Sequence, residues 1–234
     1  MNADNYLKMQ KNTYDKKTQG WSVKKKSHYP IGGYEEHNAW EDYDTYLFSY
    51  VEKEKRKDLV ALEYGCGPGR NIVKYSSVFK RVDGVDISDT CITAAKSNIA
   101  NAQIQSNVLL CDGKSIPFSD ESYDAVFSVI CLQHICVHEI RYNIMKEVYR
   151  VLKAGGSFSF QMGYGGQTNR QTYSYYDNIY NASNTNGLAD VSIHDPKNIE
   201  DDLLEIGFKN YKYDIRPTGP KCKHRNWIWC EVKK

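Results

Sequence analysis

The stretch that decides the fold runs from residue 62 to residue 71 and reads Leu62-Glu63-Tyr64-Gly65-Cys66-Gly67-Pro68-Gly69-Arg70-Asn71. An apolar run leads into it and an amphipathic segment follows it, so the pattern predicts a strand, a glycine-rich turn and a helix. Glycine at 65 and 67 lets the backbone pass close to a ligand, because a side chain there would occupy the ligand's space. The glycine spacing alone is weak evidence, since a tight structural turn has the same composition.

Two acidic residues follow later strands at positions where they can meet a ligand. Asp86 closes the apolar run 82–87, where a carboxylate at a strand's carboxyl end can accept hydrogen bonds from both hydroxyls of a ribose. Its alternative role is a helix cap, but Ser88 and Asp89 can cap the following helix without it. Asp112, with Gly113 leaving room beside it, can accept from the amino group of adenine; a turn-forming Asp-Gly pair is the alternative.

Beyond the glycine turn, short apolar strands alternate with amphipathic helices. Strands are predicted at 59–64, 82–87, 107–111, 123–129, 157–162, 208–215 and 227–232. Helices are predicted at 71–77, 89–100, 138–152 and 196–206, and Ala154-Gly155-Gly156 is expected to end the third of them. This alternation predicts βαβ units in a parallel sheet.

The flanking segments lack this alternation. Residues 1–37 are rich in Lys and Tyr and contain helix-breaking Pro and Gly, so we expect an irregular arm with one short helix. Residues 38–57 place apolar side chains at helical spacing and predict a helix, whereas residues 163–188 show little periodicity and predict a long loop. We expect a single domain over residues 1–234, with an arm at 1–37, a cofactor-binding core at 38–162, a loop or lid at 163–194, and a helix with strands at 195–234.

Composition narrows the class of protein. Of the 234 residues 41% are hydrophobic, which is enough for a folded core, and the net charge of +2 creates no large field, so composition does not favour nucleic acid as a partner. The sequence contains neither an apolar run of about 20 residues nor the apolar core of a signal peptide, so we expect no membrane association and a cytoplasmic location. Seven cysteines, an odd number, fit a reducing compartment.

Five motifs between residues 59 and 162 carry a family resemblance. They are Leu62-Glu63-Tyr64-Gly65-Cys66-Gly67-Pro68-Gly69, Gly84-Val85-Asp86-Ile87-Ser88, Cys111-Asp112-Gly113, Ile116-Pro117-Phe118 with Ser122-Tyr123-Asp124, and Val151-Leu152-Lys153-Ala154-Gly155-Gly156. Together they resemble the class I S-adenosylmethionine-dependent methyltransferases, especially the broad type 11 group. Tyr64 and Ala154 depart from the family's usual residues without removing a cofactor contact. The two-step glycine spacing also argues against a dinucleotide dehydrogenase, whose third glycine comes later.

The resemblance implies an α/β Rossmann-like three-layer sandwich, whose seven-stranded, mostly parallel sheet has an antiparallel last strand. It implies S-adenosylmethionine as cofactor and S-adenosylhomocysteine as product. The methionine part would contact Glu63, Gly65 and Gly67, the ribose would contact Asp86, and adenine would lie between Ile87 and Asp112. The residues expected to contact the cofactor are Glu63, Gly65, Cys66, Gly67, Gly69, Asp86, Ile87, Asp112, Gly113 and Ile130.

His134, just after the fourth strand, is the candidate catalytic base. Methyl transfer mainly requires alignment of the acceptor with the methyl group and exclusion of water, so a base helps when the acceptor is a hydroxyl. The alternative is that His134 positions the cofactor or the following helix. Cys131, Cys136 and His138 lie nearby, but their close alternating spacing does not match paired zinc ligands, so we expect no metal.

Aromatic and polar residues outside the core are candidates for the acceptor pocket, namely Trp21, Tyr34, His37, Tyr164 and Arg170. The aromatic ones could equally pack the arm onto the sheet. We expect a methyltransferase, monomeric or homodimeric, that acts on an O or N atom of a small molecule or glycan. One alternative is a protein or RNA methyltransferase docked through basic residues. Another is a non-catalytic, cofactor-binding partner subunit.

Overall fold

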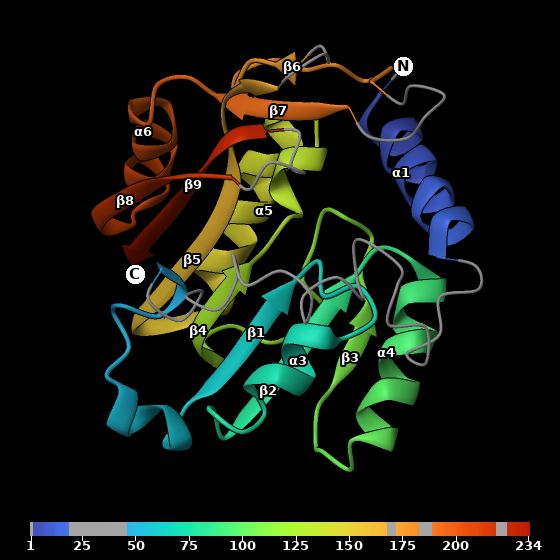
Figure 1. Cartoon of the computed structure of the whole chain (residues 1–234), viewed down its shortest axis with the longest axis vertical. Helices are drawn as coiled ribbons and strands as arrows, with labels where there is room; N and C mark the ends of the chain where they lie inside the picture. Colours follow the sequence, from blue (N-terminus) through green and yellow to red (C-terminus); the bar gives the residue numbers. More distant parts are fainter. Residues whose placement is uncertain (1, 19–45, 168–171, 183–188, 219–223) are drawn as a thin grey trace.

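The computed structural model describes residues 2–18, 46–167, 172–182, 189–218 and 224–234, and its strands form one sheet (Figure 1). Five parallel strands form its centre in the order β3-β2-β1-β4-β5. They are β1 (Val60–Tyr64), β2 (Arg81–Asp86), β3 (Val108–Leu110), β4 (Tyr123–Ser128) and β5 (Leu152–Gln167). Because all five run the same way, their carboxyl ends, and the loops that follow them, meet at one edge of the sheet.

Two long strands from the end of the chain extend the sheet beyond β5, on the side opposite β4. β9 (His224–Lys233) pairs antiparallel with β5, and β8 (Lys209–Pro217) pairs antiparallel with β9. The seven strands β3-β2-β1-β4-β5-β9-β8 therefore form a mostly parallel sheet whose last strand is antiparallel. This confirms the predicted Rossmann-like class.

Two further short strands lie where the sequence predicts a long loop. β5 continues to Gln167, β7 (Asp190–Ile193) pairs parallel with it at Gly163 and Tyr164, and β6 (Thr172–Tyr173) pairs with β7. The interpretation of residues 163–194 as a loop is therefore wrong for these described parts. The physical reason is that β7 is only four residues long, and its two polar residues are buried like the two apolar ones, so the pattern does not mark one exposed and one buried face.

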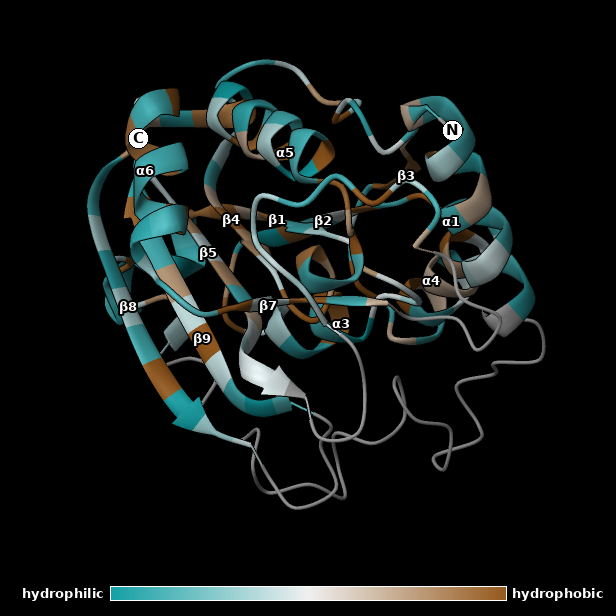
Figure 2. Cartoon of the chain, turned by 90° about the horizontal axis from the view of Figure 1, so that it is seen from above, coloured by the Kyte–Doolittle hydropathy of each residue, from teal (hydrophilic) through white to brown (hydrophobic). Residues whose placement is uncertain are grey.

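Helices cover both faces of the sheet (Figure 2). On one face α5 (His138–Val151) and α6 (Lys197–Ile206) share one hydrophobic core with Leu62, Val85 and Val126 of the sheet. On the other, α3 (Arg70–Tyr75) and α4 (Asp89–Asn101) pack on Ala61, Val82 and Phe127. Neighbouring residues of β1 thus enter opposite cores, as the two-residue period of a strand requires. The result is the expected three-layer sandwich.

Three local predictions differ from the structure. The arm contains a 16-residue helix, α1 (Ala3–Thr18), which is longer than expected. In the described part of the predicted 38–57 helix, residues 46–47 are helical, a turn follows, and the 3-10 helix η2 (Lys53–Asp58) replaces the rest, because this charged run has no apolar face. α5 ends at Val151, and Gly155, at φ +77°, instead belongs to an irregularity at the start of β5.

Candidate cofactor and active site

The glycine turn connects β1 to α3 and lies against the segment that follows β4. Gly65 has φ +74°, and the amide N–H groups of Gly65 and Cys66 both donate to the Val85 carbonyl, at 2.8 and 3.0 Å. A Cβ atom on Gly65 would lie 2.3 Å from Cys131 Sγ, so a side chain cannot fit there without movement of Cys131. On Gly67 a Cβ atom would meet no described atom within 4 Å, which leaves this side of the turn open.

Asp86, the last residue of β2, closes the turn from the other side. Its Oδ2 accepts from the Gly67 amide and its Oδ1 from the Ser88 amide, both at 2.9 Å. Ser88 Oγ caps α4 by accepting from the Cys91 amide at 3.1 Å, so Asp86 is not required as a cap. Burial raises the pKa of the Asp86 carboxyl, with Asp15 adding to the effect and backbone N–H groups opposing it.

Glu63 lies beneath the turn and is only 2% exposed. Its Oε1 accepts from Asn71 Nδ2 at 2.6 Å, but its buried Oε2 has no hydrogen-bond partner in the part of the chain that the structure describes. Burial raises the pKa of Glu63 to about 8, the Asn71 hydrogen bond lowers it, and Asp86 raises it. An unpaired buried carboxylate oxygen is costly, and a cation placed beside it would remove that cost.

Asp112 and Gly113 follow β3 at the same edge. Asp112 is exposed, and its Oδ1 accepts from the amides of Lys114 and Ser115, both at 2.8 Å, so this carboxylate forms the turn that was its alternative role. A Cβ atom on Gly113 would lie 2.6 Å from Leu7 Cδ2 and 3.0 Å from Ile87 Cδ1. Leu7 of α1 therefore occupies the room beside Gly113, and the predicted adenine contact of Asp112 stays a prediction.

Ile130, directly after β4, has a backbone conformation that is rare for a branched residue, with φ +51°. Its amide donates to Gln161 Oε1 at 3.0 Å, and Gln161 Nε2 donates to Gln133 Oε1 at 3.2 Å. Such strain costs about 1–3 kcal/mol and clusters at functional sites. The buried glutamine pair thus fixes the backbone that leads from Ile130 to His134.

Helix α1 lies across this edge of the sheet, which the sequence did not predict. The Tyr6 hydroxyl accepts from the Cys136 amide at 2.7 Å and donates to the His134 carbonyl at 3.3 Å. Two turns further on, Asp15 Oδ1 accepts from Ser88 Oγ at 2.6 Å. α1 therefore spans the segments that follow β2 and β4. Residues 6, 7, 10, 11, 14 and 15 form one helix face, but its mixed polarity hides this face from an apolar pattern search.

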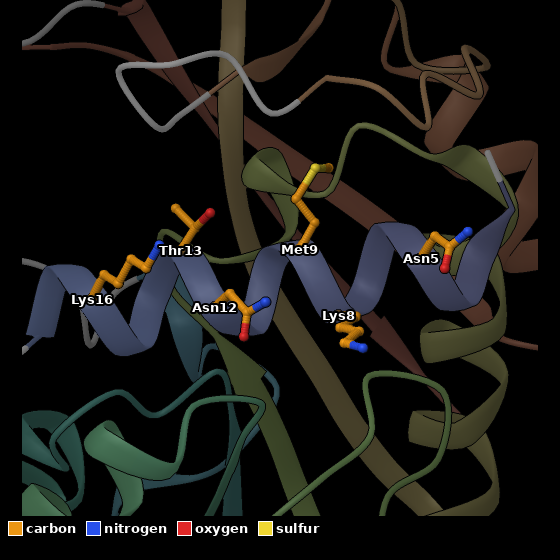
Figure 3. Close-up of a pocket in the computed structure, with 6 residues that line it drawn as sticks. All are labelled: Asn5, Lys8, Met9, Asn12, Thr13 and Lys16. Atoms are coloured by element: carbon orange, nitrogen blue, oxygen red, sulfur yellow. The ribbon is translucent and has the colours of Figure 1, made fainter.

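The opposite face of α1 lines a surface pocket (Figure 3). Its described lining residues are Asn5, Lys8, Met9, Asn12, Thr13 and Lys16. None of them is an acid, and Met9 among them also packs against the hydrophobic core. None of the described lining residues belongs to the glycine turn, to Asp86 or to the His134 cluster.

His134 lies at the end of the 3-10 helix η3 (Leu132–His134) and is held by an acid from β7. Its Nδ1 contacts Asp190 Oδ1 at hydrogen-bonding distance, and His224 Nε2 of β9 lies 3.4 Å from Asp190 Oδ2. Burial alone would raise the pKa of Asp190. His134 and His224 lower it by more, so the pKa of Asp190 is below its usual range. The sequence did not reveal this cluster, because 56 residues separate His134 from Asp190.

The predicted acceptor residues are only partly described. Tyr164 lies on β5, half-buried against the core. Trp21, Tyr34, His37 and Arg170 lie outside the described residues. No group of three or more His, Cys, Asp or Glu side chains suited to a metal occurs within the described ranges. None of the described helices is long and apolar enough to cross a membrane.

Comparison with known proteins agrees with the geometry of the turn. Residues 62–160, which include the glycine turn, Asp86 and His134, match the family model described as a methyltransferase domain. The chain belongs to the class I S-adenosylmethionine-dependent methyltransferases. This confirms the family expected from the five motifs.

Relatives of this methyltransferase differ in length and name. "Probable tRNA methyltransferase 9B" of Mus musculus is 29% identical over 122 residues, which cover 52% of this chain and 25% of the relative, so the chain spans about a quarter of that protein. "Uncharacterized methyltransferase C70.08c" of Schizosaccharomyces pombe is 33% identical over 174 residues, covering 71% of this chain and 66% of the relative. A solved S-adenosylmethionine-dependent methyltransferase from Methanosarcina mazei shares the fold, with a TM-score of 0.58, 19% identity, and coverage of 80% of this chain and 95% of that one.

The residues of this methyltransferase fit the family's cofactor. The unpartnered Glu63 Oε2 suits the ammonium of an amino acid group, and the open side of Gly67 leaves backbone accessible. The Gly67 amide bonds to Oδ2 of Asp86 and the Ser88 amide to Oδ1, and a carboxylate has about four acceptor sites, so Asp86 can accept a further hydrogen bond. A ribose hydroxyl is a donor that can make such a hydrogen bond to Asp86.

Removing the Tyr6 hydroxyl should loosen α1. In a Tyr6→Phe variant the buried Cys136 amide loses its acceptor, which costs about 1–3 kcal/mol. We expect the α1 amides to exchange with solvent at least about tenfold faster, as measured by hydrogen–deuterium exchange. Lys8→Ala, on the outer face, is the control and should leave exchange unchanged. Equal protection in Tyr6→Phe and the parent protein would show that this hydroxyl does not hold the helix.

Proposed function

We propose that this protein transfers the methyl group of S-adenosylmethionine to an O or N atom of a small molecule. The observation that carries the proposal is the meeting of Glu63, the open glycine turn and Asp86 at one sheet edge, with His134 after the neighbouring strand. The cofactor supplies a methyl group on a positively charged sulfur, which is a good leaving group. The protein's task is then to bind both molecules in line and to exclude water.

In this proposal each residue has a separate task. The Glu63 carboxylate binds the ammonium of the cofactor's amino acid part, and Asp86 binds the ribose hydroxyls. Leu7 and Ile87, which converge on Gly113, offer an apolar contact for the adenine ring. Tyr14 of α1 has its pKa raised by burial first and then by Cys131, Asp190 and Asp86, so it lies near both the ribose-binding acid and the His134 cluster.

A small acceptor is favoured by the position of α1. This helix is tied to the segments after β2 and β4 by Asp15 and Tyr6, so it covers part of the edge where the acceptor must approach. A site under a docked helix suits a molecule that fits beneath it better than a folded RNA. The tRNA relative keeps RNA as the second candidate, because its similarity extends over half of this chain.

The test is transfer of tritium from S-adenosyl-[methyl-3H]methionine to two separate acceptor pools. One pool is a cell extract of molecules below about 3 kDa, and the other is total tRNA; boiled protein and an Asp86→Ala variant are controls. We expect label in the small-molecule pool only. Label in tRNA would overturn the choice of acceptor, and the absence of label from both pools, with cofactor bound, would favour a non-catalytic partner subunit.

A further inference from the structure

We propose that Asp190 and His224 are positioning residues for His134, which they hold with Nδ1 protonated and Nε2 ready to accept a proton, and that the acceptor is therefore a hydroxyl. This inference rests on the proposed methyl transfer and deepens it. Neither positioning residue lies in the matched family segment, which ends at residue 160.

The cluster is rigid and nearly dry. The exposed fractions of the His134, Asp190 and His224 side chains are 11%, 7% and 3%. Asp190 and His224 lie on β7 and β9, which both pair with β5. A Cβ atom on Gly163 of β5 would lie 2.1 Å from the His224 ring, so the absence of a side chain at 163 is what lets this histidine reach the acid.

The direction of the hydrogen bond follows from charge. An ionised carboxylate can only accept, so the Nδ1 that faces Asp190 Oδ1 must carry the proton. The lowered pKa of Asp190 is consistent with an ionised acid. In neutral His134 the lone pair is then on Nε2, on the ring edge away from Asp190, and Nε2 makes no hydrogen bond to any residue that the structure describes.

The backbone of His134 is fixed as well. Its amide donates to the Cys131 carbonyl at 3.0 Å, and its carbonyl accepts from the Tyr6 hydroxyl and, at 3.3 Å, from Gln10 Nε2. Ring and backbone are thus both held, the first by β7 and the second by α1. A base held in one orientation by an acid is the arrangement that the Ser-His-Asp enzymes use for proton removal from a hydroxyl.

In the proposed step a hydroxyl of the acceptor is methylated and loses its proton to His134. The acceptor oxygen bonds to the methyl carbon while the carbon–sulfur bond breaks and its electron pair stays on sulfur. The hydroxyl proton passes to Nε2 of His134, which becomes an imidazolium paired with Asp190. A hydroxyl keeps its proton at neutral pH and gains nucleophilicity as the proton leaves, whereas a neutral amine already offers a lone pair, so an oriented base indicates an oxygen acceptor.

The titratable groups around His134 come from several elements. Asp190 faces it from β7, with His224 of β9 behind that acid. Tyr6 reaches its carbonyl from α1, and Tyr14 of the same helix interacts with Asp190 and Cys131. Of these, Asp190 makes the ring contact, so its replacement should have the largest effect on the histidine tautomer.

The first test needs no acceptor. Two-bond 15N–1H correlation spectra of histidine-labelled protein distinguish the two neutral tautomers, and His134→Asn identifies the His134 signals among the six histidines. We expect His134 as the Nδ1–H tautomer in the parent protein, and a shift toward Nε2–H in Asp190→Asn. Asp202→Asn is the matched control, because Asp202 is also buried and contacts a histidine, His138, at 2.7 Å; it should change His138 alone.

The second test uses a hydroxyl acceptor identified by tritium transfer. Asp190→Asn should lower kcat at least about tenfold with unchanged affinity for S-adenosylhomocysteine, and Asp190→Glu should restore part of the rate. An Nε2–H tautomer in the parent protein, an unchanged kcat in Asp190→Asn, or an acceptor nitrogen would overturn the inference. Failure of S-adenosylhomocysteine to bind at all would instead overturn the proposed function, so the two failures are distinguishable.

Discussion

Replacing Gly65 with alanine is expected to weaken the binding of S-adenosylhomocysteine by roughly 100-fold or more, equivalent to about 2.7 kcal/mol. The new Cβ atom would lie 2.3 Å from Cys131 Sγ and 2.7 Å from Cys131 Cβ, and φ at this position is +74°. Cys131 cannot escape by rotating its thiol, because its own Cβ is also too close. The glycine turn and the segment after β4 must therefore separate, and the site opens. Isothermal titration calorimetry measures the change.

Gly155→Ala separates steric clash from backbone strain. Gly155 has φ +77°, nearly the same as Gly65, but a Cβ atom there would meet no described atom within 4 Å. Its alanine variant should lose only about 1 kcal/mol of folding stability and keep its affinity for the ligand. Equal effects of the two variants on affinity would contradict the assignment of Gly65 to the ligand-binding turn.

Glu63→Gln is expected to stabilise the ligand-free protein at high pH while weakening cofactor binding. The folded-state pKa of Glu63 is raised from 4.5 to about 8, chiefly by burial. An acid with a raised pKa contributes stability that is present below the unfolded pKa and is lost as pH rises through the folded pKa. The parent protein should therefore lose stability relative to Glu63→Gln between about pH 4.5 and pH 8, by an amount on the order of 5 kcal/mol.

Chemical denaturation at pH 5 and pH 9 measures this difference, with Glu231→Gln as the control. Glu231 is equally buried, but its Oε1 accepts from the Tyr50 amide at 2.9 Å and its Oε2 contacts Ser49 and Lys212. Its replacement should destabilise the protein at both pH values. If Glu63→Gln is no more stable than the parent protein at pH 9, the raised pKa of Glu63 is refuted.

The same acid should release a proton when cofactor binds. A cation beside Oε2 favours the ionised form, so binding between about pH 5 and pH 8 should transfer up to one proton to the buffer. The binding enthalpy of the parent protein should then depend on the buffer's ionisation enthalpy. Glu63→Gln should show no such dependence and at least about tenfold lower affinity.

The sequence predicted the parts of the site that lie on one short segment or at strand ends. The glycine turn, Asp86 and the capping role of Ser88 follow from local order along the chain, because consecutive parallel strands bring their carboxyl ends together. Glu63 was assigned by resemblance, but its unpaired oxygen depends on packing that no local pattern reveals.

The parts that could not be predicted depend on polar side chains whose hydrogen-bond partners lie far away in the sequence. α1 docks through Tyr6 and Asp15, whose partners are about 70 to 130 residues away, and the apolar period that marks a core helix is absent from that face. β7 is short and half polar, and Asp190 is buried only because His134 and His224 surround it. A buried polar residue of this kind can be identified only once its interaction partners are known, and only the folded chain brings these partners together.

The most direct test of the cofactor assignment is calorimetric titration of S-adenosylhomocysteine into the parent protein and an Asp86→Ala variant, with NADH as a control ligand. We predict micromolar binding of S-adenosylhomocysteine to the parent protein and no binding of NADH. The variant should bind S-adenosylhomocysteine at least about tenfold more weakly, which is a loss of ~1.4 kcal/mol of binding free energy. Binding of NADH alone, or of neither ligand, would contradict the assignment of the glycine turn and Asp86 to S-adenosylmethionine.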